Sequence, residues 1–227
     1  MKKENKILGL MIAVIMLSSI FVGCTGQGTT PPSTTDATSK YGGTLVFGSS
    51  GDAARLDPAD VTDGESIQRM DNIHEGLVMY EEGTTSIKPA LATEWTISED
   101  KKTITFKLRK GVKFHKNFGE MTADDVVFSF ARQYDTENWY HSKGEWAYWG
   151  YMFSDIEKVE KIDDYTVAIH MSKPNSSMMT SLAMFTAAIV SEKAAKQYGD
   201  DYFKNPVGTG PFEFVEWVKD DHITLKA

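Results

Sequence analysis

Strict alternation of polar and apolar side chains predicts one strand of the fold. From Thr103 to Arg109 every second residue is apolar, which is the pattern of a strand with one buried face. Residues 98–101, just before it, have the composition of a turn. Short apolar runs predict further strands at 44–47, 165–169 and 212–218.

Helices are predicted where a capping residue precedes apolar positions three and four apart. Thr62 and Glu65 have the spacing of a capping box. The apolar residues that follow lie close to one helical face, at Ile67, Met70, Ile73 and Leu77. Two more helices are expected, one starting at 122–125 with apolar Val126, Val127, Phe130 and Ala131, and one over 191–198. The fold class is therefore α/β, in the α+β sense of a mixed sheet with helices.

The last residues predict a hairpin. Residues 219–221 have turn character, and 223–226 form its second strand. The chain stops at Ala227, inside that strand, which would leave an unpaired edge. We expect the sequence to be the N-terminal part of a longer domain.

The first 23 residues have the pattern of a secretory signal. Lys2, Lys3 and Lys6 precede an apolar run from 7 to 22. That run is about 16 residues, shorter than the ~20 of a membrane-spanning helix. It ends in Phe21-Val22-Gly23-Cys24, which resembles the lipobox of bacterial lipoproteins. We expect Cys24 to become the lipid-modified N-terminus, which would hold the protein at a membrane.

Composition sets the remaining boundaries. Residues 24–40 are rich in Thr, Ser, Gly and Pro, and predict a flexible tether before a folded part over 41–227. The formal net charge of −8 argues against nucleic acid as a partner. The single cysteine excludes intrachain disulfides. We expect a monomer.

Catalytic and cofactor motifs are missing from the sequence. It contains no HExxH, GxSxG, GxxxxGK[ST] or GxGxxG motif. The five histidines lack metal-ligand spacing, so no metal and no cofactor is predicted. Gly208-Thr209-Gly210-Pro211 lacks the Lys-Ser/Thr of a phosphate loop and predicts a tight bend before a strand. The sequence therefore predicts a protein that is not an enzyme.

One segment is dense in aromatic residues. WYHSKGEWAYWGYMF, at 139–153, has seven aromatic side chains and no clear helical period. Trp139, Tyr140 and Trp149 could supply rigid contact area to a ligand. The same side chains could instead pack a lobe of the protein together. The sequence leaves both interpretations open.

The order of short motifs resembles the extracellular solute-binding proteins of family 5, which supply dipeptides, oligopeptides or nickel to ABC importers. The motifs include GGTLVFG at 42–48, LDPA at 56–59, HEGLVMY at 74–80, IKPALATEW at 87–95, KKTITFKLRKGVKFH at 101–115, TADDVVFSF at 122–130, DDYTVAIHMSKP at 163–174 and PVGTGPFEFVEW at 206–217. The stretch at 133–150 is most similar to the dipeptide-binding branch.

The resemblance implies the bilobal fold of the type II periplasmic binding proteins. The first lobe would start with residues up to about 60 and resume from about 190, with an extra subdomain between them; the second lobe would lie beyond Ala227. In this family a loop of the first lobe contacts the peptide backbone, and it matches Thr62-Asp63-Gly64 here. Asp63 stands where relatives have Ser. Asp52 and Tyr140 are weaker candidates for the cleft.

The function that the resemblance implies is peptide capture outside the cell membrane by hinge closure, followed by delivery to permease subunits. The location would be the extracellular face, or the periplasmic side in a host with an outer membrane. Two alternatives keep the fold and change the ligand, to an oligosaccharide stacked on 139–153 or to nickel or haem. A third, from another class, is a surface-anchored peptide hydrolase, which the missing motifs disfavour.

Overall fold

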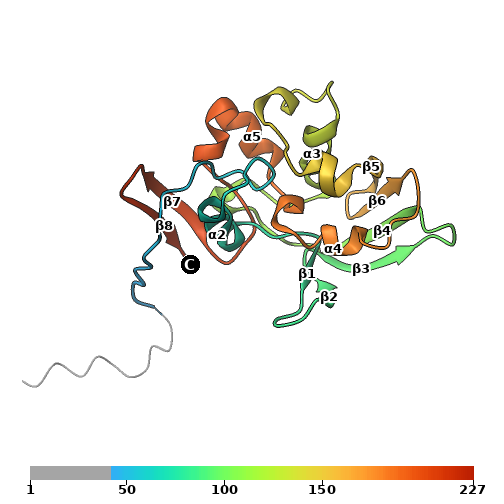
Figure 1. Ribbon diagram of the computed structural model, residues 1–227, viewed down its shortest axis with the longest axis horizontal. Helices are drawn as coiled ribbons and strands as arrows, with labels where there is room; N and C mark the ends of the chain where they lie inside the picture. The colour runs from blue at the N-terminus through green and yellow to red at the C-terminus, as the bar shows by residue number, and fades with distance from the viewer. Residues whose placement is uncertain (1–41) are drawn as a thin grey trace, which may run out of the picture. The chain divides into compact units, whose positions relative to one another are not determined.

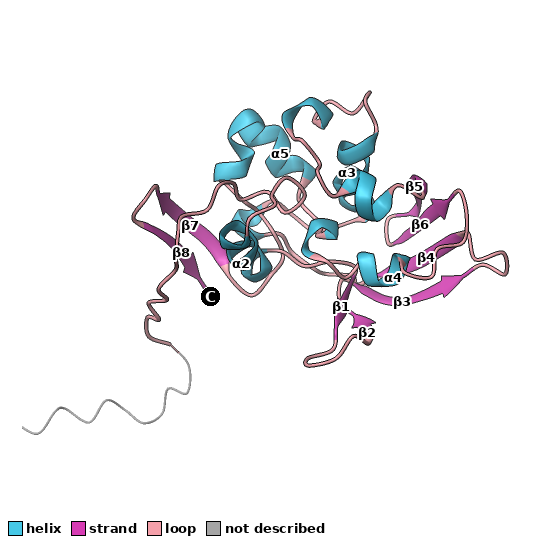
Figure 2. Ribbon diagram, in the orientation of Figure 1, coloured by secondary structure: helices cyan, strands magenta, loops and turns pink. Residues whose placement is uncertain are grey.

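The computed structural model describes residues 42–227, so the predicted signal at 1–23, Cys24 and the tether at 24–40 lie outside the described residues. The chain divides after Phe47 into two parts. Residues 48–227 form one compact unit of mixed helices and strands, drawn in Figures 1 and 2. The α/β class predicted from the sequence is confirmed.

A four-stranded antiparallel sheet is the largest element of this unit. Its strands are ordered β3 (Ala92–Ile97), β4 (Thr103–Leu108), β6 (Thr166–Met171) and β5 (Ile156–Asp163). Ile104, Phe106 and Leu108 of β4 are buried, as the alternation at 103–109 predicts. Helix α3 (Ala123–Tyr134) packs on β5 and β6, so one face of the sheet meets the main core (Figure 1).

Two helices form where the sequence predicts them, one starting at 122–125 and one over 191–198. Thr122 precedes α3, and its hydroxyl and the Asp125 carboxylate form the reciprocal bonds of a capping box. Ser191 caps α5 (Glu192–Tyr198), where its hydroxyl accepts from the Ala194 N–H at 3.2 Å. The described residues also contain a short helix, α4 (Met178–Ser181), and short helical segments at 115–117, 141–143, 149–153, 185–187 and 199–204.

Two hairpins extend from this core. β1 (Val78–Tyr80) pairs with β2 (Ile87–Pro89), and β7 (Glu213–Val218) pairs with β8 (His222–Lys226). Asp220 has a φ of 62° in the turn between β7 and β8. The hairpin predicted at the end of the chain is therefore present, with its turn where the sequence places it.

The strand predicted at 44–47 is not formed. Residues 42–49 have no regular secondary structure, and none of the three sheets in the described part of the chain includes them. Leu45 and Val46 are each 89% exposed. A strand is defined by its ladder hydrogen bonds to a neighbour, so an apolar run alone does not produce one.

A second, smaller core lies around helix α2 (Gly64–Ile73). Leu56, Met70, Ile73 and Phe214 are buried there, which joins the loop before α2 to the β7–β8 hairpin. The bend at Gly208–Pro211 lies on the C-terminal end of α2, because the Gly210 N–H donates to the Ile73 carbonyl at 2.9 Å. The position of α2 is thus fixed from both the bend and the hairpin.

Candidate functional site

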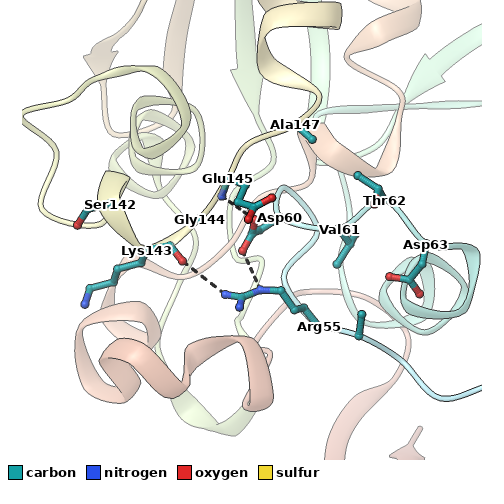
Figure 3. A pocket seen from close by; sticks show the side chains of 11 residues that line it. Arg55, Asp60, Val61, Thr62, Asp63, Ser142, Lys143, Gly144, Glu145 and Ala147 are labelled. Carbon is teal, nitrogen blue, oxygen red and sulfur yellow. Dashed lines mark hydrogen bonds and ion pairs between the residues drawn. The ribbon is translucent and has the colours of Figure 1, made fainter.

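A pocket of about 410 Å³ opens between two loops of the compact unit (Figure 3). One wall is formed by residues 54–55 and 60–63, on either side of the LDPA motif and before α2; the other is formed by residues 142–147. The residues that line it are Ala54, Arg55, Asp60, Val61, Thr62, Asp63, Ser142, Lys143, Gly144, Glu145 and Ala147. The lining is mostly polar, which suits a ligand held by hydrogen bonds and charges.

Direct polar contacts join the two walls. Asp60 Oδ1 accepts from the Glu145 N–H of the opposite wall at 2.8 Å, while Asp60 Oδ2 lies 2.7 Å from Nε of Arg55 on its own wall (Figure 3). Arg55 Nη2 donates to the Lys143 carbonyl at 3.5 Å. Burial raises the pKa of Asp60, and the bonds from Glu145 and Arg55 offset only part of that rise. One carboxylate therefore holds the opposite wall through its backbone.

Thr62 and Asp63, both predicted to contact a ligand, lie on the first wall. Thr62 is exposed, and Asp63 Oδ1 accepts from the Ser66 N–H at 2.7 Å. The capping box predicted from Thr62 and Glu65 is wrong by one residue, because Asp63 is the N-cap of α2. Glu65 does not reach back along the helix since its carboxylate binds Ser49, Ser50 and Arg69.

Gly64 is the first residue of α2 and follows this wall. A Cβ built on it meets no other atom within 4 Å. The first N–H groups of a helix have no intrahelical partner, so the backbone at Gly64 and Glu65 is available to a ligand's carbonyl oxygen. Thr62 and Asp63 thus bring a hydroxyl and a carboxylate to the pocket, and the backbone of Gly64 follows directly after them.

The Asp52 side chain contacts the β7–β8 hairpin and does not line the pocket. Its carboxylate accepts from the Trp217 indole N–H at 2.9 Å, from the Asp220 N–H at 2.9 Å and from the Ala53 N–H at 2.8 Å. Burial would raise the pKa of Asp52, but these hydrogen bonds lower it below its ordinary value. Its acceptor atoms therefore hold the hairpin against the loop.

The three aromatic candidates lie outside the pocket lining. Tyr140 is 2% exposed and belongs to the main core. Trp149 packs on that core and stacks on Tyr134, with ring centroids 4.8 Å apart. Trp139 is 41% exposed and stacks on Phe128. The aromatic segment supplies packing at these positions, while its polar stretch at 142–147 forms the pocket wall.

Five polar residues of the pocket were not identified from the sequence: Arg55, Asp60, Ser142, Lys143 and Glu145. They lie on irregular loops, where no periodic pattern marks the residues that face inward. The glycine at 144 was a weak signal of a loop, but the pairing of 55–63 with 142–147 spans more than 80 positions of sequence. Distant pairing of this kind cannot be inferred from one sequence.

A buried ion pair lies behind the two walls. Both nitrogen tips of Arg132 donate to Asp57, Nη1 to Oδ2 at 2.6 Å and Nη2 to Oδ1 at 2.7 Å. The side chains are 0% and 1% exposed. Burial tends to lower the pKa of Arg132, but the adjacent Asp57 carboxylate raises it above its ordinary value. The guanidinium therefore stays charged inside the core.

His74 is buried beside this pair and is held neutral. Burial lowers the pKa of His74 to about 3; Asp57 opposes that shift, and His115 and Arg132 add to it. Among the described residues neither ring nitrogen of His74 has a hydrogen-bond partner. Protonating this imidazole in the folded protein is therefore unfavourable at any pH above about 3.

Stability should fall between pH 6.5 and pH 3 because of His74. The unfolded imidazole takes up a proton below pH 6.5, whereas the folded one stays neutral until about pH 3, so acid favours the unfolded chain. At pH 5 this proton uptake lowers the free energy of unfolding by about 2 kcal/mol, at ~1.36 kcal/mol per pKa unit. We expect urea unfolding to show that His74→Phe loses less stability than the wild type between pH 7 and pH 5. Equal losses would contradict a neutral buried His74.

Within residues 42–227 no group of three or more His, Cys, Asp or Glu side chains is placed to hold a metal ion. Nor does any helix of this range combine the length and apolar character required to cross a membrane.

Comparison with known proteins places the sequence motifs in a family. The model of the bacterial extracellular solute-binding proteins, family 5 Middle, matches residues 86–227. The dipeptide-binding protein of Escherichia coli (strain K12) is 39% identical over 212 residues, covering 85% of this chain and 39% of that protein. Heme-binding protein A of Haemophilus influenzae is also 39% identical over 212 residues, covering 85% of this chain and 38% of its own.

A solved structure supports the same family assignment. The periplasmic binding protein DppA from Helicobacter pylori, in complex with the peptide STSA, has a TM-score of 0.73 and 43% identity. The match covers 77% of this chain and 37% of that one. The chain thus spans less than two fifths of the length of that structure, and about two fifths of the curated relatives it matches.

Proposed function

Because the chain belongs to the bacterial extracellular solute-binding proteins of family 5, we propose that it is the receptor part of an ABC importer that captures di- or oligopeptides. The observation that supports this proposal is that Thr62 and Asp63 line the polar pocket. With Gly64, which follows them, they form the segment that the family resemblance assigns to the peptide backbone. Relatives named for dipeptides and a solved homologue holding a peptide support it.

In the proposed mechanism the chain supplies one side of the peptide site. The peptide main chain would hydrogen-bond to the open backbone at Gly64 and to the Thr62 hydroxyl. Its side chain would occupy the pocket between the walls, where water completes the remaining hydrogen bonds. A second lobe would close over the peptide, and binding would shift the population from open to closed. Asp52, Trp139, Tyr140 and Trp149 would act by holding the surrounding structure.

The proposal includes the location of the protein. Lipid on Cys24 would anchor the mature chain to the cell membrane, with residues 24–40 as the tether, and permease subunits would receive the peptide. The intact mass of the native protein tests the anchor, since an unmodified Cys24 or cleavage elsewhere would contradict it.

Fluorescence titration tests the ligand. The sequence has five tryptophans, and we expect a saturable change when the full-length protein without residues 1–24 receives micromolar dipeptides. Because one relative is named for haem and one solved homologue, NikZ of Campylobacter jejuni, holds Ni(L-His), haemin and nickel-histidine are titrated in parallel, with a β-linked oligosaccharide. A response to one of these and none to peptides would contradict the proposal.

Replacing Gly64 by tryptophan should weaken peptide binding about tenfold or more, which is ~1.4 kcal/mol. The first added atom, the Cβ, meets no other atom within 4 Å, so we expect the fold to accept the substitution and the loss to come from contact with the ligand. Isothermal titration of the full-length protein measures the affinity. Gly150→Trp is the matched control, because its Cβ also meets no other atom within 4 Å and lies outside the pocket. Unchanged affinity in Gly64→Trp would remove Thr62-Asp63-Gly64 from the site.

A further inference from the structure

Arg132 lies between the two loops that form the pocket, although it lines neither wall. It is on the last turn of α3 and is fully buried. Its fork of two hydrogen bonds holds Asp57, three residues before Asp60 of the first wall. Asp57 in turn shapes that loop, because its carboxylate accepts from the Ala59 N–H at 3.1 Å and its carbonyl accepts from the Asp60 N–H at 3.1 Å.

The same guanidinium contacts the second wall. Its carbon lies 5.1 Å from the centre of the Trp146 ring, within the range of a cation–π interaction. Trp146 stands between Glu145 and Ala147, which both line the pocket. Its φ of 48° is unusual for a residue other than glycine, and its indole N–H donates to the His141 carbonyl at 2.7 Å. The ring must be held in place for this backbone to persist.

Tyr140 and Phe128 complete the surroundings of Arg132, with ring centres 5.5 Å and 5.8 Å from its guanidinium carbon. Arginine suits this place because its planar group makes a fork to a carboxylate and stacks against rings at once, which lysine cannot do. Tyr140, which the sequence offered as a ligand contact, thus packs against Arg132 and affects the pocket only indirectly.

We propose that Arg132 is a positioning residue that fixes the separation of the two pocket walls, through Asp57 on one side and Trp146 on the other. It sets the affinity for ligand without touching it. The identity of the ligand rests on the proposed function. The effect of Arg132 on the hydrogen bond from the Glu145 N–H to Asp60, which links the two walls, does not depend on it.

Two variants test it in the full-length protein. Arg132→Lys keeps the charge and loses the fork, whereas the double variant Asp57→Asn, Arg132→Met removes both charges together. Ile169→Ala is the control for destabilisation, since Ile169 is fully buried in β6 on the sheet. Amide exchange by NMR and dipeptide titration are measured where each protein is folded.

We expect the Glu145 amide to exchange at least tenfold faster in both Arg132 variants, and dipeptide affinity to fall at least tenfold. Ile169→Ala should leave both unchanged within a factor of two. Wild-type protection of Glu145 in the Arg132 variants would overturn the inference, as would a similar loss in Ile169→Ala. If wild type binds no peptide, the proposed function fails, while the exchange of Glu145 still decides the role of Arg132.

Discussion

Gly208→Ala is expected to lower the free energy of unfolding by about 3 kcal/mol or more. The φ of Gly208 lies outside the left-handed region, so alanine is permitted by the backbone and the effect is one of space. Its Cβ would lie 2.0 Å from the Ile73 carbonyl oxygen and 2.7 Å from the Ile73 carbonyl carbon. Both are backbone atoms at the end of α2, and neither can rotate away.

The loop would have to leave the end of α2 to make room for this methyl group. Two hydrogen bonds depend on the present position, from the Gly210 N–H to the Ile73 carbonyl at 2.9 Å and from the His115 N–H to the Gly208 carbonyl at 3.0 Å. Because Asp63 and Gly64 begin the same helix, the pocket wall would shift with it. The bend predicted at 208–211 is therefore also a support of the candidate site.

Urea unfolding at pH 7 measures the loss. Gly150→Ala is the matched control, since a Cβ there meets no other atom within 4 Å, and its stability should stay within about 0.5 kcal/mol of wild type. If Gly208→Ala unfolds at the same urea concentration as the control, then the close approach of this loop to α2 is wrong.

Local sequence patterns predicted most of the regular structure. The alternation at 103–109 became β4, and the capping residues Thr122 and Ser191 lie directly before α3 and α5. These patterns work because capping and half-burial are decided within a few residues. The same logic placed the turn of the last hairpin at Asp220, although this residue is not glycine.

Features that depend on distant partners were not predictable. The apolar run at 44–47 satisfies every local rule for a strand, yet it belongs to no sheet of the described residues. The cap of α2 moved to Asp63 because Glu65 binds Ser49, Ser50 and Arg69 instead. In each case a contact between separated segments decides the outcome.

The candidate site also has residues that could be predicted from the sequence and residues that could not. Thr62 and Asp63 came from the family resemblance and do line the pocket, whereas no pattern in the sequence indicated the polar residues at 142–145 of the opposite wall. Aromatic density predicted the right segment but not which of its residues would face the pocket. Tyr140 turned inward because the buried Arg132 gives its ring a partner.

Removing either member of the Asp57–Arg132 pair should destabilise the fold by about 3–5 kcal/mol, because it leaves an unpaired charge in the core. The two side chains are 1% and 0% exposed, so water cannot reach the remaining charge. Arg132→Met leaves the carboxylate alone, and Asp57→Asn leaves the guanidinium alone. We expect each single variant to unfold at a much lower urea concentration than wild type.

The double variant Asp57→Asn, Arg132→Met should be more stable than either single variant, because no charge is then buried without a partner. A double-mutant cycle from urea unfolding gives the coupling, for which we expect about 2 kcal/mol or more. Lys196→Met is the surface control: its pair with Glu192 is partly exposed, at 56% and 30% of the two side chains, and pairs of this i,i+4 kind contribute about 0.3–0.5 kcal/mol. Additive losses in the cycle would contradict this expectation, because they would mean that the two buried charges do not compensate each other.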